Sequence, residues 1–293
     1  MGTASKEMTT KPYVWLNGAL LPEEAARVSL FDRGYLYGDG LFETMRAYNS
    51  KLFRLRQHFD RIAAGASEIG IPLPLAFHQL KHVATELLQA NGLADAYLRL
   101  TISRGVGLGP LPAADLSPTI SLIARPLRLP SPQEYETGWK GILAVSSLAP
   151  GAQLSQLKSL SYLDKLLAKM QAKAAGAQEA ILTNARGEIT EASTSNIFII
   201  KGQQLLTPPI SAGLLPGITR AVILELAAQL SLTINETAIK PADVFVADEC
   251  FLTNSIMEIM PLTRLADRAI GTGRPGAMTL TIQQAYRETV LSE

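Results

Sequence analysis

Apolar residues in the first part of the chain alternate with polar residues in some segments and follow helical spacing in others. Paired alternating runs around Asn-Gly and Asn-Ser steps are typical of β-hairpins. Runs with apolar residues three and four positions apart predict amphipathic helices. We therefore expect an α+β arrangement of antiparallel hairpins with two helices. The predicted hairpins cover 13–21 and 42–55, the helices 57–70 and 75–91, and two further strands 96–103 and 119–125, with a Gly/Pro loop at 105–118.

The second part of the chain repeats this mixture with more strands. Residues 127–133 (LRLPSPQ) carry two prolines in seven positions and predict a linker between two domains, 1–126 and 134–293. An Ala/Leu/Lys helix and a helix introduced by Pro216-Gly217 separate short apolar strands. The predicted strands are 142–146, 179–183, 196–201, 204–207, 232–236 and 249–253, and the predicted helices 161–175, 219–230 and 275–290, with a turn at 184–188.

Composition narrows the class of protein without indicating its chemistry. The chain has 293 residues, with 27 Lys+Arg against 26 Asp+Glu and 47% hydrophobic residues. This charge balance argues against a nucleic-acid partner. The single cysteine, Cys250, cannot form an intrachain disulfide and is expected to pack in the core. Residues 1–12 lack an apolar segment and no apolar run approaches ~20 residues, so we expect a cytoplasmic protein without a membrane partner.

Two motifs resemble known sites but lack the context that those sites need. Gly271-Thr-Gly273-Arg-Pro-Gly276 matches G-x-G-x-x-G, yet a dinucleotide site requires a βαβ unit and an acidic residue about 20 positions on. Only 17 residues follow, so a turn into the last helix is expected. His78 and His82 have metal-ligand spacing, but without a Glu between them we predict a solvated helix face and no metal.

Three segments in the second half suggest chemistry. Lys158 stands just before an apolar helix, and Glu191 precedes a run of small hydroxyl residues. Residues 215–220 (LPGITR) form a Gly-containing turn that starts a helix, whose free N–H groups and positive dipole end favour an anion. Taken alone, Lys158 would be one solvated lysine among several, because Lys165 and Lys169 follow it.

These segments, with three others, resemble the class IV (branched-chain/D-alanine) aminotransferase family of pyridoxal-phosphate enzymes. The other segments are DRGYLYGDGLFET (32–44), FRLRQHFDRI (53–62) and ADECFLTNSIMEIMP (247–261), and the resemblance covers about residues 13–290. It implies the fold type IV architecture, a mixed α+β structure with a smaller N-terminal domain and a larger, β-barrel-like C-terminal domain with helices that binds pyridoxal 5′-phosphate.

The resemblance also implies roles for individual residues. Lys158 matches the lysine that forms the Schiff base with the cofactor and then moves the proton of the substrate, as a buried lysine with a depressed pKa can. Glu191 would face the pyridine nitrogen, where a carboxylate favours the protonated ring. Tyr162 either donates to the phenolate oxygen of the cofactor or is a core tyrosine. The phosphate would be held by Arg61, by the backbone at Ile218 and Thr219, and by the Ser255 hydroxyl.

Substrate choice is predicted from the first domain. Tyr97 and Arg99 resemble the pair with which branched-chain enzymes accept the side-chain carboxylate of glutamate, and both would face one side of a strand. The loop 105–109, with Leu108, is similar to the loop that reaches the neighbouring subunit's site in those enzymes. Tyr37, Phe42 and Ile256 would wall the substrate pocket.

Other members of the family remain as alternatives. The loop lacks the Arg and His that trap the carboxylate in D-amino-acid enzymes, but Asp32-Arg33-Gly34 is shared with them and with aminodeoxychorismate lyases. Residues 253–258 (TNSIME) also resemble the lyases. We predict a cytoplasmic homodimer that transfers amino groups between branched-chain L-amino acids and 2-oxoglutarate, with a lyase or a D-amino-acid/(R)-amine transaminase as the alternatives.

Overall fold

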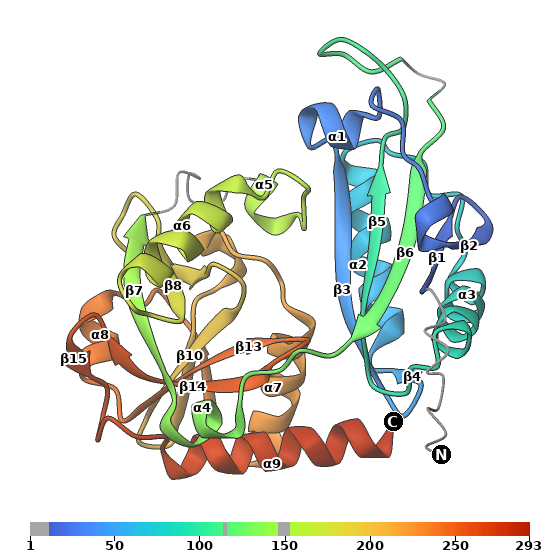
Figure 1. Cartoon of the computed structure of the whole chain (residues 1–293). Coiled ribbons are helices and arrows are strands. Elements are labelled where there is room, and N and C mark those ends of the chain that lie inside the picture. Colours follow the sequence, from blue (N-terminus) through green and yellow to red (C-terminus); the bar gives the residue numbers. More distant parts are fainter. Residues whose placement is uncertain (1–11, 114–115, 146–152) are drawn as a thin grey trace, which may run out of the picture.

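The computed structural model describes residues 12–113, 116–145 and 153–293. Its strands form two sheets that stand side by side, one from each half of the chain (Figure 1). The mixed α+β fold with two sheets confirms the expected fold class. Of the helices in the described residues, none is long and apolar enough to cross a membrane.

The first sheet has six strands in the order β2-β1-β6-β5-β3-β4, and every neighbouring pair is antiparallel. The β1–β2 hairpin turns at Asn17 and Gly18, which both have positive φ, the conformation that Asn-Gly pairs favour in two-residue hairpins. The strands are β1 (Tyr13–Leu16), β2 (Ala19–Pro22), β3 (Gly40–Tyr48), β4 (Lys51–Leu52), β5 (Ala96–Ser103) and β6 (Thr119–Pro126).

Helices α2 (Leu55–Glu68) and α3 (Phe77–Ala90) supply the apolar faces that bury one side of this sheet. Met45 on β3 and Leu98 on β5 lie in the same core and are fully buried. Because side chains alternate along a strand, the residues between these core positions point to the opposite side of the sheet. The first sheet thus offers a second face toward the other half of the molecule. The short helices η1 (Glu23–Ala25) and α1 (Arg33–Tyr37) lie between β2 and β3 in the chain.

The second sheet has nine strands, with β15 paired to β14 beside the path β12-β11-β10-β13-β14-β7-β8-β9. Strand β10 is buried on both sides, with Ile199 in one apolar core and Phe198 in another beneath two helices. The strands are β7 (Trp139–Val145), β8 (Glu179–Thr183), β9 (Ile189–Ala192), β10 (Asn196–Lys201), β11 (Gln204–Thr207), β12 (Thr233–Glu236), β13 (Glu249–Asn254), β14 (Glu258–Leu265) and β15 (Arg268–Ala269).

The helices of the second half cover this sheet from several directions (Figure 1). The long last helix runs along one end of the sheet and packs on α7, and α6 packs on β8. The helices are α4 (Pro132–Thr137), α5 (Gln153–Gln156), α6 (Leu163–Ala174), η2 (Ile210–Ala212), α7 (Ile218–Gln229), α8 (Pro241–Phe245) and α9 (Ala277–Ser292).

The two sheets are tied together near the start of β3. Lys158 accepts a backbone hydrogen bond from Phe42, and the Leu160 N–H donates to Gly40, so residues 158–160 lie along the strand. Farther along β3, Arg46 forms an ion pair of 2.9 Å with Glu258. These contacts hold the two sheets facing each other across the site described below. The stretch 127–133 runs between them, and we propose it as the domain boundary.

Most predicted elements are present. The differences include a hairpin that ends earlier than predicted and a strand that contains a proline. The predicted strands 96–103, 179–183, 196–201 and 204–207 have the bounds of β5, β8, β10 and β11. The prediction that the second hairpin extends to residue 55 is wrong, because β4 ends at Leu52 and α2 begins at Leu55. Strand β14 was not predicted, since its Pro261 is a residue that argues against an interior strand. Residue 146, the predicted end of a strand, lies outside the described residues.

The glycine motif at 271–276 and the single cysteine occupy ordinary structural positions. Gly276 is the N-cap of α9, and Gly271 and Gly273 have positive φ, as expected of a turn into the last helix. Cys250 is buried within an apolar core, and burial raises the pKa of its thiol. It therefore packs as an apolar residue, as predicted.

Candidate active site

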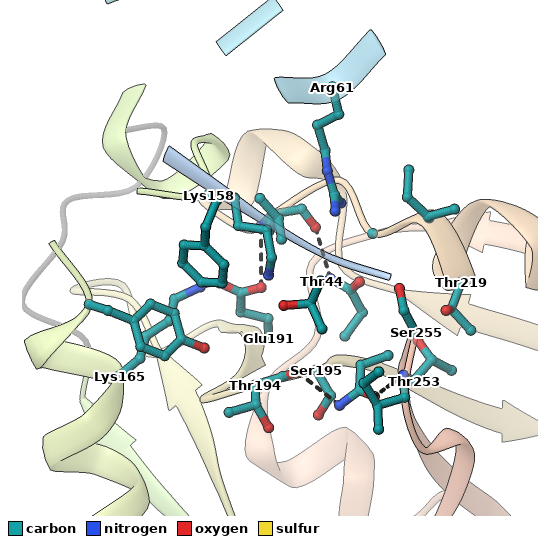
Figure 2. Close-up of a pocket in the computed structure, with 18 of the residues that line it drawn as sticks. Thr44, Arg61, Lys158, Lys165, Glu191, Thr194, Ser195, Thr219, Thr253 and Ser255 are labelled. Atoms are coloured by element: carbon teal, nitrogen blue, oxygen red, sulfur yellow. Dashed lines mark hydrogen bonds and ion pairs between the residues drawn. The ribbon is translucent and has the colours of Figure 1, made fainter. Parts of the chain in front are cut away.

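A cavity of about 270 Å³ lies between the two sheets and is lined by residues from both. Figure 2 shows the side chains of Lys158, Lys165 and Glu191 on one side of it and those of Thr219 and Ser255 on the other. We call the first group the lysine end, and Arg61, Gly217, Ile218 and Thr219 the anion end. The other lining residues are Phe42, Thr44, Arg99, Tyr162, Thr194, Ser195, Asn196, Leu215, Thr253, Asn254, Ser255 and Ile256.

The first sheet contributes its outer face to the cavity. Phe42 and Thr44 on β3 and Arg99 on β5 alternate with buried core residues of the same strands, which places them on the side opposite the helices. The Arg99 guanidinium carbon lies 3.7 Å from the centroid of the Phe42 ring, and Lys158 Nζ lies 4.6 Å from it. Phe42 therefore supports two cations, one from each half of the chain.

Lys158 is the amine at the lysine end, and its position is set by the backbone. The hydrogen bond from the Phe42 N–H to the Lys158 carbonyl, 2.9 Å, fixes the residue against β3. Burial lowers the pKa of Lys158 to about 7, and the positive charge of Arg61 acts in the same direction. A large fraction of this side chain is therefore the neutral, nucleophilic amine near neutral pH.

Arg61 at the anion end is held by a buried carboxylate. Glu43 on β3 points to α2, and its two oxygens accept from Arg61 Nε and Nη2 at 2.7 Å each. His58 Nδ1 lies 2.7 Å from the same carboxylate. Burial alone would raise the pKa of Glu43, but Arg61 and His58 outweigh it and bring the pKa to about 2. Arg61 is thus locked in one geometry by a bidentate ion pair.

The start of α7 completes the anion end. Its N-cap, Gly217, has no side chain to satisfy the first helical N–H groups, which include those of Ile218 and Thr219. Arg61 Nη1 donates to the Pro216 carbonyl at 2.8 Å, so the guanidinium stands beside this helix terminus. A Cβ on residue 217 would overlap the amide oxygen of Asn196, so glycine is required here. A guanidinium next to a free helix N-terminus is a site for a phosphate group.

Glu191 and Lys165 form an ion pair at the lysine end. Lys165 Nζ lies 2.7 Å from Glu191 Oε1, and the Leu215 N–H donates to Oε2 at 3.2 Å. Burial alone would lower the pKa of Lys165, but the Glu191 carboxylate outweighs it and the pKa stands above its ordinary value. The Lys165 side chain lines the cavity and is only 19% exposed.

Hydroxyl groups line the floor of the cavity between the two ends. The Ser195 and Thr253 hydroxyls are buried and have no hydrogen-bond partner in the described part of the chain. Buried polar groups are costly when unpaired, so these two are suited to a polar ligand. The neighbouring turn, which carries Ser255 and Ile256, is fixed by the Asn254 side chain, which accepts from the N–H groups of Ile256 and Met257.

The structure brings most of the predicted site residues to one cavity but leaves three outside its lining. Tyr37 and Leu108 are 47% and 69% exposed on α1 and on the loop beside it. Tyr97 shares the strand face of Arg99 but stands opposite Arg46 in the sheet register. Tyr162 lines the cavity, and its hydroxyl donates to the Ser193 carbonyl at 3.1 Å. Those that line the cavity are Lys158, Arg61, Glu191, Tyr162, Ile218, Thr219, Ser255, Phe42, Arg99 and Ile256.

Sequence reasoning missed two charged residues, Glu43 and Lys165. Glu43 sits between Leu41 and Met45 at an inward position of an alternating strand, where a charge requires a buried partner. Lys165 lies three residues after Tyr162, which places both on the same helix face. Both signals were present in the pattern of the sequence.

The donors of the cavity fit pyridoxal 5′-phosphate, the cofactor implied by the sequence resemblance. The anion end offers a guanidinium and free helix N–H groups to a phosphate. The lysine end offers a partly neutral amine to an aldehyde and a carboxylate to a ring nitrogen. Arg99 adds a cation above Phe42 that can receive a substrate carboxylate.

Comparison with known proteins agrees with this geometry. The family model described as amino-transferase class IV matches residues 40–265. A putative branched-chain-amino-acid aminotransferase of Methanocaldococcus jannaschii is 38% identical over 277 residues, which cover 94% of this chain and 95% of that protein. A D-alanine aminotransferase of Bacillus licheniformis is 33% identical over 281 residues, which cover 96% and 98%.

Solved structures show the same arrangement. The branched-chain amino acid aminotransferase of Escherichia coli has a TM-score of 0.91 at 31% identity, covering 95% of this chain and 94% of that one. The branched-chain amino acid aminotransferase from Thermobaculum terrenum, solved in its PLP-bound holo-form, has a TM-score of 0.84 at 26% identity, covering 96% and 94%.

Proposed function

The chain belongs to the class IV aminotransferase family, and from this premise we propose that it transfers amino groups between branched-chain L-amino acids and 2-oxoglutarate with pyridoxal phosphate as cofactor. The observation that supports this substrate most is the position of Arg99, whose guanidinium lies over Phe42 on the cavity side of β5. 2-Oxoglutarate has a second carboxylate that leucine lacks. The Arg99 guanidinium, placed beside the reacting amine, can bind that second carboxylate.

Each end of the cavity has its own task in the proposed reaction. Pyridoxal phosphate, when bound, supplies the aldehyde that takes up the amino group and a ring that withdraws electrons. The anion end holds and orients the phosphate, with Ser255 adding a hydroxyl. Lys158 Nζ takes the proton from the α-carbon of the amino acid, which its depressed pKa allows near neutral pH. Glu191 accepts a hydrogen bond from the protonated ring nitrogen.

We propose a cytoplasmic homodimer in which the partner completes the substrate side. Large apolar side chains remain exposed on α1 and the loop beside it, including Tyr35 at 72% and Leu108 at 69%. Leu163 and Met170 on α6 are similarly exposed, and α6 and α1 lie at the same end of the molecule (Figure 1). Exposed apolar clusters of this kind mark protein–protein interfaces. Tyr37 and Leu108 would then serve the site of the partner subunit, which accounts for their absence from the cavity lining here.

The substrate proposal is tested by comparing two half-reactions in an Arg99→Ala variant. Loss of a charge-assisted contact of ~1.5–3 kcal/mol predicts a fall in kcat/KM for 2-oxoglutarate of roughly 10- to 150-fold. The value for L-leucine should change much less. Arg125→Ala on the neighbouring strand, whose side chain pairs with Glu23 outside the cavity lining, is the matched control. Equal losses for both substrates would refute the carboxylate role of Arg99.

D-Alanine transamination is the second candidate, favoured by the 33% identity to a D-alanine aminotransferase across nearly the whole chain. The same assay separates the two: glutamate formed from L-leucine supports the branched-chain proposal. Rapid turnover of D-alanine with none of L-leucine would replace it. Aminodeoxychorismate, supplied alone, checks for the lyase reaction in the same series.

A further inference from the structure

Two lysines and one carboxylate share the lysine end of the cavity, and the structure pairs the carboxylate with the second lysine. Lys165 Nζ lies 2.7 Å from Glu191 Oε1. Within the described part of the chain, no carboxylate lies within ion-pair distance of Lys158 Nζ. The side chain of Glu191 is 6% exposed, so a counter-ion is needed inside the protein.

The other cations near the cavity do not compete for Glu191. Arg61 donates to both oxygens of Glu43 through Nε and Nη2, and its Nη1 donates to the Pro216 carbonyl. Arg99 lies over the Phe42 ring on the first sheet. Lys165 therefore neutralises Glu191, and Lys158 pairs with no carboxylate among residues 12–113, 116–145 and 153–293.

Removing Lys165 would change which lysine Glu191 attracts. A buried carboxylate without a counter-ion is stabilised by holding a proton or by attracting another cation, and Lys158 lies at the same end of the cavity as Glu191 (Figure 2). Lys158 would then be held in its protonated form, which is not nucleophilic.

We propose that Lys165 is a positioning residue that occupies the Glu191 carboxylate and so keeps the Lys158 amine free to capture the aldehyde of pyridoxal phosphate. This inference rests on the proposed function, in which Lys158 binds the cofactor. In the capture step the lysine nitrogen attacks the aldehyde carbon, a C=N bond forms, and the aldehyde oxygen leaves as water with the two amine protons. No oxidant or reductant is involved.

Charged groups from several elements face Lys158 and set the pH at which it captures the cofactor. Arg61 and His58 come from α2, Glu43 from β3, Lys165 from α6 and Glu191 from β9. Arg99 on β5 shares the Phe42 ring with it, and Tyr162 at the start of α6 packs edge-on against that ring. Lys165 and Arg61 both disfavour the protonated form of Lys158, whereas Glu43 and Glu191 favour it.

The experiment follows capture of pyridoxal phosphate by the cofactor-free protein, through the rise of the visible absorption, over a range of pH. In Lys165→Met, the midpoint pH of the capture rate should rise by about one to two units, which is a ~5- to 50-fold slower capture at pH 7. Lys165→Gln, which keeps a donor but no charge, should show the same upward shift. Lys165→Arg, which keeps the charge, should retain the wild-type midpoint. Thermal unfolding of each variant verifies that it is folded.

A double-variant cycle tests the mechanism. Adding Glu191→Gln to Lys165→Met removes the unpaired carboxylate and should return the midpoint to the wild-type value or below. An unchanged midpoint in folded Lys165→Met, or an equal shift in Lys165→Arg, would overturn the inference. Wild-type protein that captures no cofactor, or captures it equally well as Lys158→Ala, would instead refute the proposed function. The two failures are therefore distinguishable.

Discussion

The anion end and the lysine end of the cavity use a buried carboxylate in opposite ways. At the anion end, Glu43 binds Arg61 through both oxygens and fixes the cation that faces the helix terminus. At the lysine end, Glu191 binds Lys165, and no carboxylate of the described residues forms an ion pair with the neighbouring Lys158. The Glu43 carboxylate immobilises the guanidinium that binds the phosphate. The ion pair of Glu191 with Lys165 leaves the Lys158 amine free to react.

The difference shows how one type of interaction supports two functions. A binding cation benefits from being permanently charged and oriented, and a bidentate arginine pair provides both. A nucleophilic amine needs to lose its proton, and burial without a counter-ion favours that loss. A count of charges does not distinguish a binding cation from a reactive amine, because one carboxylate pairs with a cation at each end of the cavity.

The largest expected effect is the loss of stability when Glu43 is removed. Glu43→Ala leaves Arg61 buried without its partner, so we expect a loss of unfolding free energy of ~3–5 kcal/mol. Chemical denaturation measures it. Asp60→Ala, which disrupts the exposed ion pair with Arg56 on the same helix, is the matched control and should cost less than ~0.5 kcal/mol. Similar small losses for both variants would show that Arg61 is not held by Glu43.

The pH dependence of stability tests whether the Glu43 carboxylate is charged in the folded protein. The folded pKa of Glu43, about 2, lies below its ordinary value of 4.5, so its contribution is fully present above about pH 4.5. It is lost as pH falls from 4.5 toward 2 and amounts to on the order of 3 kcal/mol. The stability difference between wild type and Glu43→Gln should therefore shrink over this pH range. A difference that stays constant would argue that the Glu43 carboxylate is not charged in the folded protein.

The smallest of these effects concerns the glycine at the anion end. In Gly217→Ala the added methyl would overlap the Asn196 amide oxygen, and the α7 terminus must shift. We expect cofactor binding to weaken by ~1–3 kcal/mol, measured by equilibrium titration with pyridoxal phosphate. Asn196→Ala removes the obstacle, so binding in the double variant should exceed that of Gly217→Ala alone. Unchanged cofactor binding in Gly217→Ala would place the cofactor away from this turn.

Much of the fold follows from local patterns, and the exceptions have physical causes. Strand β5, whose residues alternate cleanly, could be predicted to its observed bounds from sequence. Strand β14 could not, because Pro261 is tolerated there by a sheet register that shifts immediately after it, between Leu262 and Arg264.

The site likewise contains residues that sequence predicts and pairings that it does not. Lys158, Arg61 and Glu191 could be located because short motifs surround them. The pairings of Glu43 with Arg61 and of Lys165 with Glu191 join residues 18 and 26 positions apart, and such pairings appear only once the chain has folded. Sequence therefore indicated some of the charges that gather at the cavity, but it missed Lys165 and did not show which charges neutralise each other.

The most direct test asks which of the two cavity lysines holds the cofactor. Protein loaded with pyridoxal phosphate is reduced with borohydride and digested, and the modified peptide is identified by mass spectrometry. We expect the phosphopyridoxyl group on Lys158, which forms no ion pair within the part of the chain that the structure describes, and no modification of Lys165. Modification of Lys165 instead, or of both lysines equally, would contradict it.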